Sequence, residues 1–118
     1  MQKYAQHSIT GIDLKNGNDC RKFFQTDDTH YDLVLHLAAI VGGRATIEGQ
    51  PLAVATDLSI DAELCQWAMR TRPGRLVYFS SSAAYPIRLQ QSAYQLKESD
   101  INLNCVDNPD MTYGWAKL

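Results

Sequence analysis

Two short apolar runs flank one long segment in which apolar residues have the spacing of a helix. Residues 31–39 form a nearly continuous apolar run, and residues 75–80 form a second one. Such runs are typical of strands that are covered on both faces, as in parallel sheets. Residues 7–13 alternate apolar and polar positions and include β-branched side chains, which predicts a further short strand ending at Asp13.

The clearest helical signal lies between the two apolar runs. Over residues 51–72, apolar side chains recur every three or four positions, at Leu52, Ala55, Leu58, Ala62, Cys65 and Met69. A Pro-Gly pair directly after this segment ends the predicted helix. Residues 19–25 form either a short helix or an irregular crossover. Residues 87–110 form a polar excursion, and a last helix starts at residue 111.

This order of elements predicts the fold class. Strands that alternate with helices indicate an α/β fold with a doubly wound parallel sheet, flanking helices and right-handed crossovers. In such sheets, sites lie beyond the carboxyl ends of the strands. The places to search are therefore the segments just after Asp13, Ala39 and Ser80.

Composition and charge narrow the classes of molecule that this chain can bind. The 118 residues are 45% hydrophobic and carry 11 Lys and Arg against 13 Asp and Glu, which describes one globular domain with no broad basic face for nucleic acid. The N-terminus has no signal core, and no apolar stretch is long enough to cross a membrane. Three widely spaced cysteines form no CxxC pair, so we expect no metal site and a reducing cytoplasm.

Two groups of residues carry candidate chemistry. Tyr113 and Lys117 are four residues apart, so on a helix they share one face. A nearby ammonium favours the phenolate, which suits Tyr113 to general acid/base work. Three serines, residues 80–82, follow the second predicted strand and can hydrogen-bond a substrate oxygen. The structural alternatives are a capping turn for the serines and a buried Tyr beside a solvated Lys.

Three segments together resemble a known family. Residues 35–39 (LHLAA), 79–86 (FSSSAAYP) and 113–117 (YGWAK) are similar to the extended short-chain dehydrogenase/reductase family, the NAD-dependent nucleotide-sugar epimerases and dehydratases. Within it, residues 36–47 and 96–100 are most similar to GDP-mannose 3,5-epimerase and GDP-fucose synthase. The resemblance covers the whole chain. It implies that residues 1–118 are an internal portion of an NAD-binding, partial Rossmann-like domain.

The resemblance also implies roles for individual residues. Ser81, Tyr113 and Lys117 would be catalytic: Tyr113 moves the proton of a sugar hydroxyl during hydride transfer, and Lys117 stabilises its phenolate and binds the nicotinamide ribose. Tyr113 and Lys117 would also bind NAD. The other expected NAD-binding residues are Asp13, Asp19, Cys20, Leu37, Ala38, Ala39 and Ser80. Substrate would be bound by Gly42, Gly43, Arg44 and Ser82. An acid at the end of the first strand disfavours a 2′-phosphate, so Asp13 favours NAD over NADP.

The chain departs from the family pattern at three places. It has no glycine-rich phosphate loop, which normally precedes the ribose acid by about 20 residues and would therefore fall before Met1. We therefore expect a fragment without the first strand, this loop and the substrate domain, which alone is inactive and binds NAD weakly. Ala83 occupies the position where the two most similar enzymes carry a Cys acid/base. Leu58, beside Asp57, occupies the position of a family Asn.

The expected partners are a nucleotide-sugar substrate and, for the parent enzyme, a second copy in a homodimer. The alternative function is a non-catalytic remnant or binding piece with no cofactor of its own. A flavodoxin-like or response-regulator domain needs neither the serines nor the Tyr-Lys pair. We interpret His36 as a satisfied core histidine, and Trp67 and Met69 as core residues of their helix.

Overall fold

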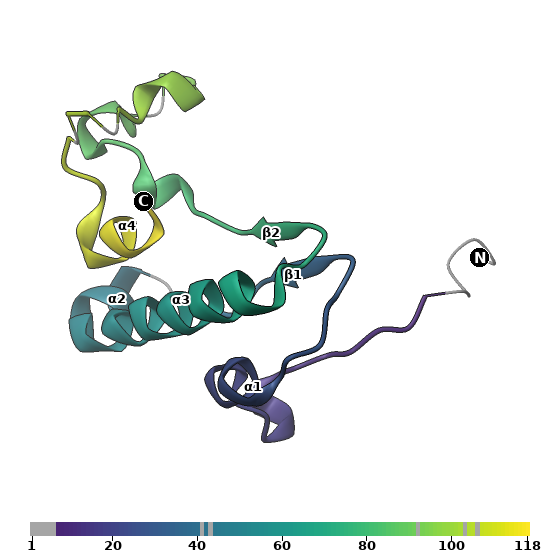
Figure 1. Cartoon of the computed structure of the whole chain (residues 1–118). Coiled ribbons are helices and arrows are strands. Elements are labelled where there is room, and N and C mark those ends of the chain that lie inside the picture. Colours follow the sequence, from purple (N-terminus) through teal and green to yellow (C-terminus); the bar gives the residue numbers. More distant parts are fainter. Residues whose placement is uncertain (1–6, 41, 43, 92, 103, 106) are drawn as a thin grey trace, which may run out of the picture.

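The computed structural model describes residues 7–40, 42, 44–91, 93–102, 104–105 and 107–118. Its helices and strands are α1 (Cys20–Thr26), β1 (Val34–His36), α2 (Arg44–Gly49), α3 (Pro51–Thr71), β2 (Leu76–Tyr78) and α4 (Met111–Lys117). Short 3-10 helices cover Leu14–Asn16, Ser82–Ala84, Ile87–Leu89 and Glu98–Asp100. The long helix α3 lies between α1 on one side and α4 on the other (Figure 1).

The sheet is a parallel pair. β1 and β2 are in register from Val34 opposite Leu76 to His36 opposite Tyr78, and α2 and α3 connect them. This confirms both apolar runs as strands of an α/β unit, although each strand is shorter than its run. Within the described residues, β2 is the only strand that pairs with β1, so the other edge of β1 is free. Leu33, Leu35 and Leu37 are exposed. The prediction that this run is covered on both faces is therefore wrong for this structure.

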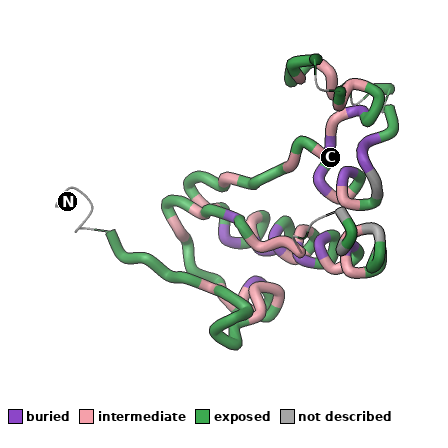
Figure 2. Tube along the Cα trace, turned by 180° about the vertical axis from the view of Figure 1, so that it is seen from behind, coloured by how far each residue is buried: buried purple, intermediate pink, exposed green. Residues whose placement is uncertain are grey.

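The strand expected over residues 7–13 is absent. This segment leads away from the sheet and is largely exposed (Figures 1 and 2). A strand needs a hydrogen-bonded neighbour, and no described backbone hydrogen bond joins this segment to β1. The segment ends where the carboxylate of Asp13 accepts the backbone N–H of Lys15 at 2.8 Å and caps the first 3-10 helix.

Helix α3 is confirmed, but the buried face is not the predicted one. Its buried apolar residues are Val54, Ile60, Leu64 and Trp67. All six residues of the expected stripe are exposed, and Met69 is 79% exposed, so the interpretation of Met69 as a core residue is wrong: Leu52, Ala55, Leu58, Ala62, Cys65 and Met69. Both stripes have helical spacing, so periodicity alone cannot choose between them. The face with the bulky Leu64 and Trp67 side chains is the one that packs inward.

An aromatic cluster anchors α1 to the C-terminal half of α3. Phe24, Leu64 and Trp67 form its centre, and the ring centroids of Phe24 and Trp67 are 5.3 Å apart. The Trp67 indole N–H donates to Asp27 at 3.2 Å, and Arg70 donates to the carbonyl of Phe24 at 2.8 Å. This confirms Trp67 as a core residue and makes Asp27 a partner of the core.

A glycine lets α4 approach the segment that follows β2. Gly114 is buried, and a Cβ there would collide with the carbonyl oxygen of Ala83 and lie 2.9 Å from Cβ of Pro109. The backbone N–H of Asp110 donates to that same carbonyl at 2.9 Å. The start of α4 is thereby fixed beside the 3-10 helix Ser82–Ala84.

Candidate active site

The predicted serines meet the predicted Tyr-Lys helix. The hydroxyl of Ser80 donates to the backbone carbonyl of Lys117 at 2.6 Å, across 37 residues of sequence. The hydroxyl of Ser81 accepts the backbone N–H of Ala83 at 3.2 Å, so this serine also caps the 3-10 helix. Ser82, the first residue of that helix, is exposed. The fold therefore places both motifs at the carboxyl end of β2.

Lys117 is buried, with 3% of its surface exposed, so the alternative of a solvated lysine is wrong. Its ammonium donates to the hydroxyl of Tyr78 at 3.0 Å and lies 3.7 Å from Oδ2 of Asp61. It also lies 5.0 Å from the centre of the Tyr78 ring. Tyr113 is half-buried one turn earlier on α4. The charged end of Lys117 is thus directed to residues of α3 and β2.

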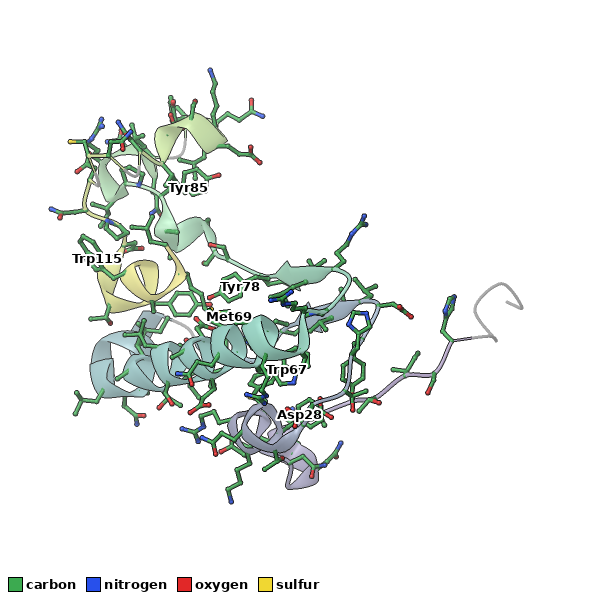
Figure 3. The ribbon with its side chains drawn as sticks, viewed as in Figure 1. Asp28, Trp67, Met69, Tyr78, Tyr85 and Trp115 are labelled. Carbon is green, nitrogen blue, oxygen red and sulfur yellow. The ribbon has the colours of Figure 1, made fainter. Side chains whose placement is uncertain are left out.

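His36, Asp61, Tyr78 and Lys117 form a set that we name the polar cluster. The Tyr78 hydroxyl donates to Oδ2 of Asp61 at 2.7 Å, and Nε2 of His36 lies 3.3 Å from the other carboxylate oxygen. The rings of His36 and Tyr78 stack, with centroids 5.6 Å apart and an angle of 14°. Figure 3 shows Tyr78 reaching from β2 towards α3.

Burial sets the protonation of the polar cluster. Desolvation raises the pKa of the Tyr78 phenol, and the adjacent Asp61 carboxylate raises it further, so Tyr78 stays a neutral donor. Desolvation also lowers the pKa of His36 against the opposing pull of Asp61, which favours the neutral imidazole. His36 is buried as predicted, but its nearest polar neighbour is a carboxylate of the candidate site.

Asp57 lies one turn before Asp61 and is fully buried. Its Oδ1 accepts the backbone N–H of Ile40 at 2.5 Å, and its Oδ2 has no hydrogen-bond partner among the described residues. Desolvation raises the pKa of this carboxyl group. The neighbouring Leu58, which we aligned with the family Asn, is exposed, so the residue that faces inward is Asp57. Two acids four residues apart on an apolar helix were the available signal for this site.

Six of the nine residues expected to hold the cofactor line one groove, and Ser80, Tyr113 and Lys117 do not. Asp13, Asp19, Cys20, Leu37, Ala38 and Ala39 all border a groove of about 550 Å³ beside the free edge of β1. Asp19 caps α1 and pairs with Arg21 at 2.7 Å, which lowers the pKa of Asp19 to about 2. Among the described lining residues, none is a serine of the 80–82 cluster or a residue of α4. His36 borders the groove and also belongs to the polar cluster, so it lies where the two regions meet.

NAD fits this groove in part. The carboxylate of Asp13 suits ribose hydroxyls, and the small side chains of Ala38 and Ala39 allow close approach of a nucleotide. The pyrophosphate, by contrast, needs the backbone donors of a glycine-rich loop, which this sequence does not contain. The residues present therefore fit the nucleoside ends of the dinucleotide but supply no cradle for its phosphates.

The expected substrate loop is only partly described. Gly42 is exposed, Gly43 lies outside the described residues, and Arg44 begins α2 while its side chain is outside the described set. A search of the described residues finds no group of three His, Cys, Asp or Glu side chains suited to hold a metal ion. Within the same residues, no helix combines the length and apolar character needed to cross a membrane.

Residues 2–118 match the model of the NAD dependent epimerase/dehydratase family. The chain belongs to this family. The enzymes of this family are NAD-dependent, and membership suggests a Rossmann-like fold. The parallel strand pair with its helices is compatible with a part of that fold. Comparison with curated proteins gave no match, and neither did comparison with solved structures. The closer similarity to GDP-mannose 3,5-epimerase and GDP-fucose synthase stays a prediction.

Proposed function

We propose that this family member acts on a nucleotide sugar, with Ser81, Tyr113 and Lys117 as its catalytic residues. The observation that carries the proposal is the hydrogen bond from Ser80 to the carbonyl of Lys117, which fixes the serine segment against the Tyr-Lys helix. Two motifs that are weak separately thereby become one site at the carboxyl end of a parallel strand, where α/β enzymes bind their ligands.

Each of the three residues has a distinct task in this proposal. Ser81 already accepts a backbone N–H, so its own hydroxyl hydrogen is available to donate to the reacting sugar oxygen. Tyr113 takes the proton of the sugar hydroxyl as a phenolate and later returns it. The ammonium of Lys117 favours that phenolate and offers a donor to the nicotinamide ribose. When bound, NAD would accept a hydride from the sugar carbon.

The remaining contacts are assigned by region. Asp13 would bind the adenosine ribose, Asp19 and Cys20 would lie near the adenine, and residues 37–39 would pass along the cofactor. Ser80 would also contact the cofactor. Residues 42–44 and Ser82 would contact the sugar nucleotide. Ala83 cannot transfer a proton, which makes an epimerisation that uses a Cys at this position unsuitable here. Oxidation and reduction at one sugar carbon, or a dehydration, are the reactions that fit.

The test replaces Tyr113 by Phe in a protein that carries these residues together with a glycine-rich phosphate loop. Loss of the acid/base should lower NAD-linked turnover of nucleotide sugars by about 10²–10⁴-fold. Tyr85→Phe is the matched control, because Tyr85 lies in the same region but has no proposed proton-transfer role. Its turnover should stay near the wild-type value. Wild-type turnover in Tyr113→Phe contradicts the proposal.

The absence of a glycine-rich loop favours a second candidate, a non-catalytic remnant of the fold. Calorimetric titration of the 118-residue chain with NAD tests whether the chain binds the cofactor by itself. We expect weak or undetectable binding, because the phosphate donors are lacking. Micromolar binding would show that another segment replaces the loop.

We also propose a second copy of the chain as a partner. The outward apolar stripe of α3, which includes Leu52, Leu58 and Met69, is the exposed surface that such a copy would cover. Burying this stripe would remove large apolar side chains from water, which is the main favourable contribution to association.

A further inference from the structure

The ammonium of Lys117 is held by residues that the sequence motif does not include. It donates to Tyr78 at 3.0 Å, and Tyr78 in turn donates to Asp61 at 2.7 Å. The Tyr78 hydroxyl therefore links the cation of α4 to a carboxylate of α3. Since an unpaired buried charge is strongly destabilising, a buried lysine needs such a counter-charge.

Asp61 is the counter-charge among the groups that face this ammonium. These groups are His36 on β1, Asp57 and Asp61 on α3, and Tyr78 on β2. His36 favours its neutral form, and burial favours the protonated form of Asp57. Asp61 lies only 3.7 Å from the ammonium and is the nearer of the two carboxylates that interact with it.

We propose that Asp61 and Tyr78 are positioning residues that hold the ammonium of Lys117 in place within the candidate active site. The catalytic consequence rests on the proposed function, because Lys117 acts there on Tyr113. The His36 ring stacks on the Tyr78 ring and restrains the phenol that links Lys117 to Asp61. The three elements β1, β2 and α3 thus determine where the reactive end of α4 lies.

The test observes the lysine ammonium directly in the 118-residue chain. With ¹⁵N-labelled lysine, a buried, hydrogen-bonded ammonium gives a slowly exchanging NMR signal, which Lys117→Arg removes and thereby assigns. Asp61→Asn removes the charge but keeps the side-chain shape, and we expect its Lys117 ammonium protons to exchange about tenfold faster. Glu63→Gln is the matched control, because Glu63 lies on the same helix and bonds Gln25 instead.

The indole signal of Trp67 reports the fold in the same samples. Faster ammonium exchange with an unchanged indole signal supports positioning. Unchanged ammonium exchange in Asp61→Asn overturns it. If Asp61→Asn loses the indole signal, Tyr78→Phe decides: faster exchange supports the proposal, and wild-type exchange overturns it. This experiment uses neither NAD nor sugar, so its failure is distinct from failure of the proposed function, which Tyr113→Phe tests.

Discussion

The two halves of α3 pack against different surroundings. The C-terminal half packs Leu64 and Trp67 against Phe24 of α1. The N-terminal half buries the carboxyl group of Asp57 as well as the apolar Val54 and Ile60, and it directs Asp61 to the polar cluster, between α4 and the sheet. Figure 3 shows the first region below α3, at Trp67, and the second above it, at Tyr78.

The difference separates what stabilises the fold from what prepares the chemistry. Apolar burial is favourable in itself, so the aromatic cluster needs no function to explain it. Buried carboxylates are costly and are kept only where partners compensate them, and perturbed ionisation is a mark of functional sites. One helix therefore supplies a stable base at one end and a polar site at the other.

Removing the aromatic anchor should have the largest effect. Trp67→Ala leaves a cavity beside Phe24 and Leu64 and should lower the free energy of unfolding by about 3–5 kcal/mol. Met69→Ala, two residues away on the exposed face, should change it by about 0.5 kcal/mol or less. Urea denaturation measures both. Equal losses in the two variants would contradict the assignment of the inward face.

Blocking the close packing of α4 against the segment that follows β2 should have the second-largest effect on stability. Gly114→Ala places a methyl group against the Ala83 carbonyl and should cost about 1–3 kcal/mol of stability. In an unobstructed helix the same change stabilises by about 1 kcal/mol, so the sign itself is informative. Gly49→Ala is the control, since nothing lies within 4 Å of its added Cβ. A more stable Gly114→Ala variant would contradict the close packing of α4.

Neutralising Asp57 should give the smallest effect, and one that depends on pH. The folded chain holds the Asp57 proton more tightly than the unfolded chain, whose ordinary pKa is 3.8. The protonated Asp57 carboxyl group therefore adds to the free energy of unfolding. This added stability is fully present below pH 3.8 and is lost as the pH rises through the raised pKa of the folded state. Asp57→Asn keeps an acceptor for Ile40 and should gain about 1 kcal/mol at neutral pH. The gain should shrink in acid, and an equal gain at both pH values in urea denaturation would contradict the raised pKa.

Sequence reasoning predicted the elements that depend on local pattern. The two strands, the long helix and the start of α4 follow from apolar runs and helical spacing, and all are observed. The strand over residues 7–13 failed because a strand also requires a neighbour. The buried face of α3 failed because both of its faces carry apolar residues.

Only those residues of the candidate site that belong to a recognisable sequence motif could be predicted from the sequence. Ser81, Tyr113 and Lys117 belong to recognisable segments, whereas the roles of Asp61 and Tyr78 depend on contacts between residues far apart in sequence. No periodicity specifies that Lys117 turns towards Tyr78. The spacing of Asp57 and Asp61 gave the sole local hint.

The most direct test of the account is the hydride step itself. A protein with these residues and a phosphate loop is mixed with NAD and nucleotide sugars, and the absorbance of reduced nicotinamide is followed in a single turnover. We predict that wild type and Glu63→Gln form reduced nicotinamide at the same rate, and that Lys117→Met does so about 10²–10⁴-fold more slowly. Formation at the wild-type rate in a folded Lys117→Met variant would contradict the account.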